Sequence, residues 1–225
     1  MDSELMQVSN LITAAFDVAK TQHPDEASKW ISLSYRLVGS TAIVMLAVSI
    51  QRAGDVDLVL RCMEDEAASA KSTGGRQGID LSFHYQKMIS ELWVSSCYEI
   101  LRTIKQRETE QEAAGLQVQG RSRTAEFTTL FADLELLRMP MDKHEIAKDK
   151  QLTAPLIMQR SPPKGDNTDQ YIYDSSDPTR SHIMPTGISK RASVTWQVLD
   201  HRSGRQYWVE RRDLADRLLA LADVT

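Results

Sequence analysis

The sequence has few of the residues that disulfide-bonded and metal-binding proteins need. Only two cysteines, Cys62 and Cys97, occur in 225 residues, too few for a disulfide framework or a cysteine-rich zinc site. Each lies in an apolar pattern typical of a helix, so we expect reduced thiols in the core of a cytoplasmic protein. We expect no metal ion and no cofactor.

Long apolar runs and strong positive charge are also missing. The most apolar stretch, residues 37–50, is too short to span a bilayer and predicts a buried helix. The first residues include Asp2 and Glu4 where a secretory signal would be basic. The formal net charge is −4, so we expect no membrane attachment and no non-specific binding to nucleic acid. Any contact with RNA has to be local.

Several familiar catalytic motifs are absent. The glycine-rich residues 74–78 lack the lysine and hydroxyl residue that end a phosphate-binding loop, and no nucleophile elbow is found. Most of the histidines stand without a second ligand at metal-binding spacing, namely His23, His84, His182 and His201. His144 is different, because it lies among several charged residues.

Helical periodicity is the main signal that the sequence does contain, because apolar residues recur at spacings of three and four. Pro24 suits the first turn of a helix, Gly54-Asp55 is expected to end that helix, and Asp80 is expected to cap the longest one. The segment 108–124 is polar and predicts a mobile connection. The pattern predicts helices over residues 3–20, 24–53, 56–70, 81–107, from 127 onward, and 211–222.

The composition changes after Lys150. Prolines and glycines are spread through residues 151–190, which predicts an extended connection or a loop over the bundle. Apolar residues then alternate on both sides of Ser203-Gly204, as expected for a β-hairpin. The predicted fold is therefore mainly α: a multi-helix bundle over residues 1–150, a connection over 151–190, and a small β-hairpin with a short helix over 191–225, appended to the bundle.

The predicted hairpin carries two tryptophans, Trp196 and Trp208. A lone hairpin is marginally stable in water, so we expect both rings to pack it onto the bundle or a partner. The alternative is that they stack on nucleic-acid bases, because arginines lie close to them in the sequence. Those arginines are Arg202, Arg205, Arg211 and Arg212.

One face of the predicted helix 81–107 is polar. Its residues follow each other at spacings of three and four, which places them on one side of a helix. They are Glu91, Ser95, Tyr98, Arg102 and Lys105. This face is either an ordinary solvated surface or part of a functional site.

The segment from Phe127 to Asp149 ends in a dense group of charges, with Arg138, Asp142, Lys143 and Glu145 around His144. Six steps of about 100° separate Arg138 from His144 on a regular helix, so their side chains diverge by about 120°. A kink or a restart of the helix at Pro140 could bring them to one surface. Arginine would then hold a phosphate, and histidine could transfer a proton near neutral pH.

The Arg138-Met-Pro-Met-Asp-Lys-His144 segment resembles the Arg-x4–6-His motif of the HEPN superfamily. Members of that superfamily are helical bundles, often dimeric, and many are metal-independent endoribonucleases of toxin–antitoxin or phage-defence systems. The resemblance implies that Arg138 and His144 are catalytic. Supporting roles would fall to residues on the polar helix face and beside the motif, namely Glu91, Tyr98, Arg102, Lys143 and Glu145.

Three functional hypotheses follow. The first is a HEPN-like protein that binds or cleaves RNA, partnered by a second copy of itself and by a protein such as an antitoxin. The second is a non-catalytic, homodimeric interaction module. The third is a bundle that binds a small ligand between its helices. The first two share the expectation of a homodimer, but only the first requires chemistry at Arg138 and His144.

Overall fold

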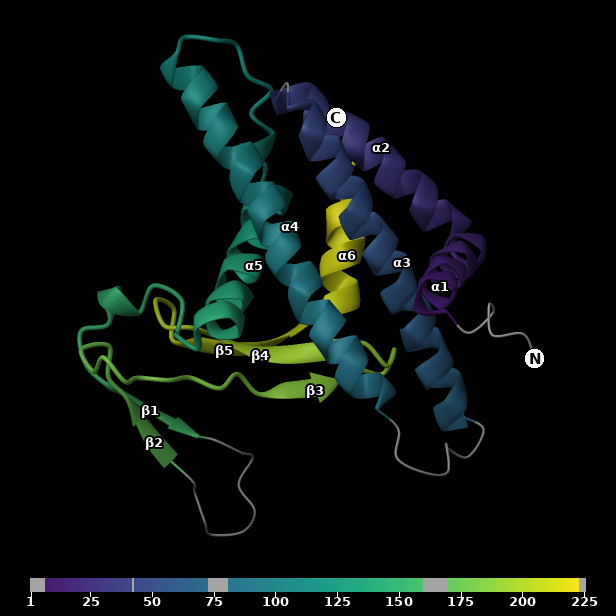
Figure 1. The fold of residues 1–225 in the computed structure, drawn as a ribbon. Helices are drawn as coiled ribbons and strands as arrows, with labels where there is room; N and C mark the ends of the chain where they lie inside the picture. Colours follow the sequence, from purple (N-terminus) through teal and green to yellow (C-terminus); the bar gives the residue numbers. More distant parts are fainter. Residues whose placement is uncertain (1–6, 42, 73–80, 160–169, 223–225) are drawn as a thin grey trace.

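The structure, a computed structural model, describes residues 7–41, 43–72, 81–159 and 170–222 (Figure 1). It confirms the mainly α fold with a C-terminal hairpin and helix. The helices are α1 (Val8–Gln22), α2 (Pro24–Thr41), α3 (Val44–Ser72), α4 (Ser82–Ala113), α5 (Ala125–Lys143) and α6 (Arg211–Ala220). The strands are β1 (Leu156–Gln159), β2 (Gln170–Tyr173), β3 (Thr186–Ile188), β4 (Val194–Asp200) and β5 (Arg205–Glu210).

The boundary between the second and third helices was predicted wrongly. The break falls between Thr41 and Val44, and α3 runs through Gly54-Asp55 without interruption. A Cβ added to Gly54 would lie 2.6 Å from Cγ of Trp30. Gly54 therefore allows α2 and α3 to pack closely around the Trp30 indole and does not end a helix. The apolar residues 37–50 are divided between the two helices.

The connection predicted over residues 108–124 is partly helical. Helix α4 continues to Ala113, and Asp80, its predicted cap, lies outside the described residues. Glu108 is buried, and its carboxylate accepts hydrogen bonds from the backbone N–H groups of Arg121 (3.1 Å) and Ser122 (2.9 Å). A single carboxylate thus holds the short 3-10 turn that leads into α5.

The proline-rich residues 151–190 are not only a connection, because they contain β1, β2 and β3. Strands β1 and β2 pair with each other in an antiparallel two-stranded sheet. Strand β3 pairs with β4, which pairs with β5, so a third strand joins the predicted hairpin. Single-sequence periodicity does not reveal these strands, because three or four residues are too few to show an alternating pattern.

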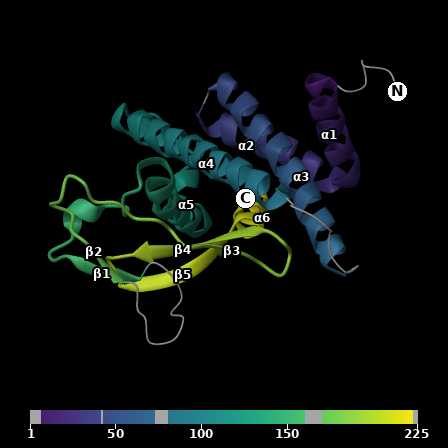
Figure 2. The ribbon, with the colours of Figure 1, turned by 60° about the horizontal axis from the view of Figure 1, so that its bottom comes forward.

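The three-stranded sheet lies against the helices with one face (Figure 2). Along β4, Val194, Trp196 and Val198 are buried, and the residues between them are partly exposed. The buried side chains belong to the same apolar core as residues of α2 to α6. The hairpin and α6 therefore share the core of the bundle. The alternation of apolar residues predicted the hairpin but left open whether it packs on the bundle or on a partner.

A buried network of charges joins the last helix to α3. The side chain of Arg211 is fully buried, and its Nε and Nη2 donate to the two carboxylate oxygens of Glu64 at 2.9 and 2.6 Å. Arg211 also pairs with Asp57, which in addition accepts from Trp30 Nε1 at 2.9 Å and Arg61 Nε at 2.8 Å. Every charge in this network has an opposite partner, as burial requires.

We predict that Arg211→Ala lowers the free energy of unfolding by about 3 to 5 kcal/mol, because the carboxylates of Asp57 and Glu64 would be left buried without their cation. Urea unfolding of both proteins measures the difference. The matched control is Arg107→Ala, since Arg107 pairs with Glu110 at 2.7 Å but lies on the surface. The control should lose about 1 kcal/mol at most. Equal losses in the two variants would contradict the role of burial.

Candidate functional site at the end of α5

Helix α5 presents the predicted motif at its C-terminal end. Thr124 caps its start by accepting a hydrogen bond from the N–H of Phe127 at 3.3 Å. The helix continues through Pro140 and ends at Lys143, so it neither stops nor restarts at the proline. His144 adopts the left-handed conformation (φ 56°) and donates its backbone N–H to the carbonyl of Pro140 at 3.2 Å. His144 is thus the C-cap residue of α5.

Arg138 faces α4. Its guanidinium lies 5.2 Å from the centre of the Tyr98 ring. Its Nε is 3.0 Å from Asp142 Oδ2, out of line for a hydrogen bond, and its Nη2 is 3.5 Å from Glu99 Oε1. The positive charge of Arg138 is therefore already balanced by two carboxylates. In the motif, the same guanidinium would bind a phosphate.

His144 is exposed and lies apart from these carboxylates. Its backbone carbonyl accepts a hydrogen bond from the N–H of His182 at 2.7 Å. The structure describes both motif residues and contains no hydrogen bond or ion pair between the Arg138 guanidinium and the His144 imidazole. Within one chain the motif does not form a joint site, and catalysis by both residues stays a prediction.

The three predicted supporting residues on α4 have different surroundings. Tyr98 is buried, stacks on Phe131 at 5.3 Å between ring centres, and has its pKa raised by burial. Arg102 donates to Glu99 at 2.7 Å beside the guanidinium of Arg138. Glu91 pairs with Lys87 at 3.3 Å, two turns of α4 earlier. The polar face of α4 is therefore not simply solvated, because its middle packs against α5.

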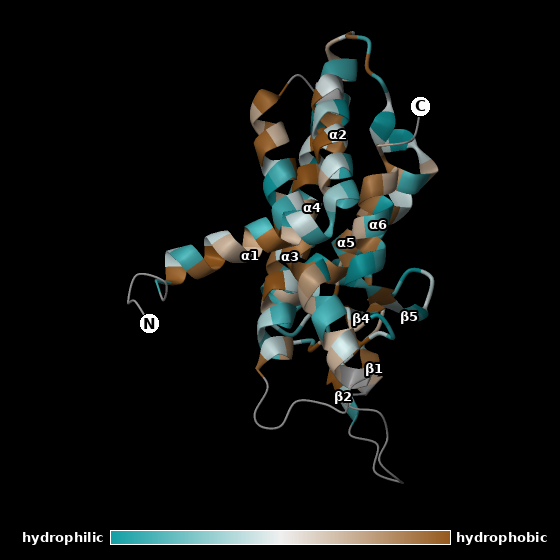
Figure 3. Ribbon diagram, turned by 90° about the vertical axis from the view of Figure 1, so that its right-hand side faces the viewer, coloured by the Kyte–Doolittle hydropathy of each residue, from teal (hydrophilic) through white to brown (hydrophobic). Residues whose placement is uncertain are grey.

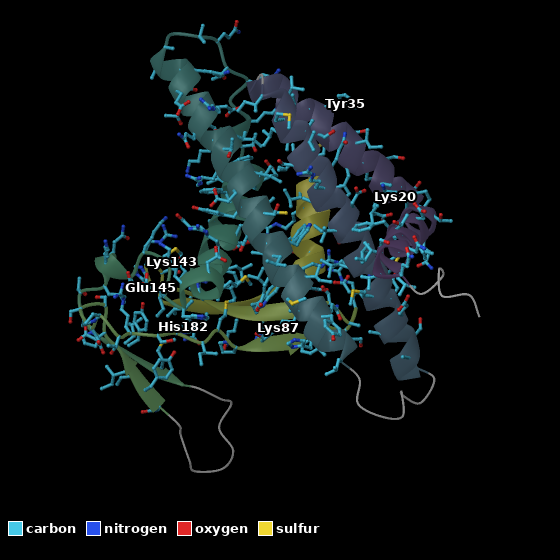
Figure 4. All side chains as sticks on the ribbon, viewed as in Figure 1. Lys20, Tyr35, Lys87, Lys143, Glu145 and His182 are labelled. Carbon is cyan, nitrogen blue, oxygen red and sulfur yellow. The ribbon has the colours of Figure 1, made fainter. Side chains whose placement is uncertain are left out.

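Lys143 and Glu145 border a cavity of about 510 Å³ beside the end of α5. Figure 4 shows both residues on the side of the molecule opposite Lys20 of α1. Four basic and two acidic side chains line the cavity. They are Lys143, Lys148, Lys150, Arg180, Glu145 and Asp149. No sequence pattern predicts this grouping, because Arg180 lies 35 residues beyond Glu145.

Arg180 holds the two acids of this cavity. Its Nε donates to Asp149 Oδ2 at 2.6 Å, and its Nη2 donates to Glu145 Oε1 at 3.0 Å. Asp149 also accepts from the hydroxyl of Tyr173 at 2.8 Å. Burial alone would raise the pKa of Asp149, but the hydrogen bonds from Arg180 and Tyr173 outweigh it and hold the pKa below its ordinary value of 3.8.

With both acids paired to Arg180, the exposed Lys143 and Lys150 leave the rim of the cavity positive. A phosphate group is the chemical class that such a rim attracts. The cavity therefore has a positively charged rim at the C-terminal end of α5, partly on residues that the motif alone did not identify.

Three of the four arginines that lie near the tryptophans in the sequence form ion pairs with acidic side chains. Arg211 is buried against Glu64, Arg212 pairs with Asp65 at 2.6 Å, and Arg202 pairs with Asp200 at 3.1 Å. Trp196 is fully buried, but Trp208 is 53% exposed. The expectation that both rings pack inward is thus correct for Trp196 and wrong for Trp208.

The described residues contain no cluster of three histidine, cysteine or acidic side chains that could hold a metal ion. Both cysteines are free and buried, as predicted. Within the same residues, no helix has the length and apolar character to cross a membrane. Comparison of the chain with family models, curated proteins and solved structures finds no match.

We predict that Asp149→Asn destabilises the protein by about 1 to 3 kcal/mol at pH 7, because Arg180 and Tyr173 lose a buried, charged acceptor. The pKa of Asp149 is depressed by folding, so its contribution is present above pH 3.8 and is lost as the pH falls further. The free energies of unfolding of the variant and the parent protein, measured in urea, should therefore differ less at pH 3 than at pH 7. The exposed Asp213→Asn is the control, and a loss that does not depend on pH would contradict the prediction.

Proposed function

We propose that the chain is a helical interaction module that assembles with a second copy of itself through α1. The observation that carries the proposal is that the apolar stripe of α1 is exposed. Val8, Leu11 and Ile12 are 70%, 54% and 52% exposed. An amphipathic helix normally buries such a stripe, since apolar surface left in water costs about 25 cal/mol per Å².

The packing of α1 explains this exposure. Of its 15 residues, all of which the structure describes, only Ala19 is buried. Ala19 contacts Leu58 and Cys62 of α3, and Lys20 pairs with Asp55 at 3.0 Å. Figure 3 shows the remainder of α1 projecting from the side of the bundle. The helix is therefore anchored at its C-terminal end, and the N-terminal part of its stripe lies beyond the surface that α3 covers.

A second copy is the occupant that suits this helix best. No charged side chain occurs between Val8 and Phe16. In a two-fold symmetric pair the same surface meets itself, so a charge of one sign would be repelled by its own copy. The uncharged stripe avoids this repulsion, and pairing would cover the apolar side chains of both copies. A strongly charged partner would find no complementary group on it.

We predict that the Leu11→Glu/Ile12→Glu double variant weakens self-association roughly 100-fold, because carboxylates would be buried without a cation. Sedimentation equilibrium should detect dimers of the parent protein and monomers of the variant. The matched control, Thr13→Glu/Ala14→Glu, adds the same charge to exposed residues of the same helix outside the stripe. It should remain dimeric. A parent protein that is monomeric at all concentrations would contradict the proposal, as would a dimeric stripe variant.

A metal-independent ribonuclease is the second candidate. The positive rim at Lys143 and Lys150 supports it, because His144 is exposed at the adjoining helix end. A phosphate held at that rim would place an RNA 2′-hydroxyl within reach of a base such as imidazole. Arg138 would contribute only if it left Glu99 and Asp142 for the phosphate, within one chain or across a dimer.

We predict for this candidate that RNA is cleaved in the presence of EDTA and that His144→Ala lowers the rate by about 100-fold or more. Arg138→Ala should do the same. Because His144 is exposed, its variant should keep the melting temperature of the parent. His84→Ala, another exposed histidine, is the control and should retain full activity. Cleavage at the parent rate in both the Arg138 and the His144 variant would exclude the assignment.

A further inference from the structure

The outer face of the three-stranded sheet is not covered by helices (Figure 2). Trp196 and Val198 point into the core, so Gln197 between them lies on the outer face. Gln197 is paired in register with Trp208 of β5, and the neighbouring pair on the same face joins Leu199 to Gln206. This face therefore combines an exposed indole with two primary amides.

A cavity of about 500 Å³ lies against this face and reaches the β1–β2 sheet. Trp208, Gln197 and Gln206 form one side, and Ile157 of β1 lies on another. None of the residues that line it has an acidic side chain, a lysine or an arginine. Its volume is typical of small-ligand sites. A third cavity, between α2 and α6, is smaller, at about 200 Å³.

The Trp208 indole lies across β3. A Cβ added to Gly187 would be 3.4 Å from Cζ3 of Trp208 and 3.0 Å from Oγ1 of Thr195. The absence of a side chain at Gly187 thus lets the indole rest close to the strand while about half of the residue remains exposed. A large aromatic ring supported by backbone on one side is a rigid platform for stacking.

The side chain of His182 also lines this cavity, and it is polar but uncharged. It is 3% exposed, and its Nδ1 lies 2.8 Å from the hydroxyl of Tyr171. Burial lowers the pKa of its imidazole to about 4, so the ring is neutral at physiological pH. His182 lies between β2 and β3 in the chain, and Figure 4 shows it below Glu145. The described residues that line the cavity are therefore uncharged, and they present amide, hydroxyl and imidazole groups.

We infer that this cavity binds a nucleobase, stacked on Trp208 and recognised at its edge by Gln197 and Gln206. Ionic ligands would find no opposite charge there, and a purely apolar ligand would leave the amides without hydrogen bonds. Sugars present mainly hydroxyl donors, which carboxylates hold best, and the lining has none. A base is uncharged, planar and rich in amide-like donors and acceptors, which is the chemistry that an aromatic platform with glutamines matches.

The base could belong to a free nucleoside or to single-stranded RNA, and titration can distinguish the two. The full chain is titrated with adenosine, cytidine and a short single-stranded oligoadenylate, with calorimetry and tryptophan emission as readouts. The other three tryptophans, Trp30, Trp93 and Trp196, are buried, so quenching should come from Trp208. Equal affinity for adenosine and the oligonucleotide indicates a nucleoside site. Much tighter binding of the oligonucleotide than of adenosine indicates a site for single-stranded RNA.

Trp208→Ala should weaken binding roughly 10- to 100-fold, because stacking on the indole is lost. Trp208→Phe, which keeps an aromatic ring, should restore part of the affinity, and Gln197→Ala should change the preference between adenosine and cytidine. All three variants should keep the melting temperature of the parent. The inference is overturned if no nucleobase probe binds, if Trp208→Ala binds as tightly as the parent, or if only a neutral strand-forming peptide binds. None of these outcomes depends on whether α1 forms a dimer.

Discussion

The fully buried guanidinium of Arg211 is the interaction on which the arrangement of this molecule depends. Its two carboxylate partners, Asp57 and Glu64, both belong to α3, and the arginine itself begins α6 directly after β5. Removing three charges from water is costly, so the cluster is stable only when all of its members are in place. This requirement ties the C-terminal end of the chain to a helix formed more than 140 residues earlier.

The position of α6 determines which surfaces are covered. With Arg211 fixed against α3, strand β5 is held at the helices, and Trp196 of the adjoining β4 is buried in the common core. The opposite face, with Trp208, has no helix over it. On the other side of the molecule, α1 crosses α3 and projects away from it, so only the C-terminal part of α1 is covered (Figure 3). Both surfaces to which we assign binding are thus surfaces that the helix packing leaves uncovered.

The motif at the end of α5 illustrates how local geometry limits a prediction from spacing. Arg138 and His144 are close in sequence, but α5 does not bend enough to join them. Arg138 packs on Tyr98 and pairs with Glu99 of α4, while His144 is the C-cap residue of α5. The Tyr98 ring and the Glu99 carboxylate of α4 hold the Arg138 guanidinium, so it does not pair with His144. The cavity beside His144 is built instead by Arg180, which arrives from a turn after β2.

The sequence by itself determined the helical character of the chain, the hairpin around Ser203-Gly204 and the burial of both cysteines, because periodicity and turn chemistry act between near neighbours. Only the tertiary structure decided that Gly54 continues a helix, since this depends on the Trp30 ring packed against it. It also decided which tryptophan is buried, which acids the arginines pair with, and that the stripe of α1 is exposed. Each of these outcomes depends on contacts between distant segments, and no local pattern records them.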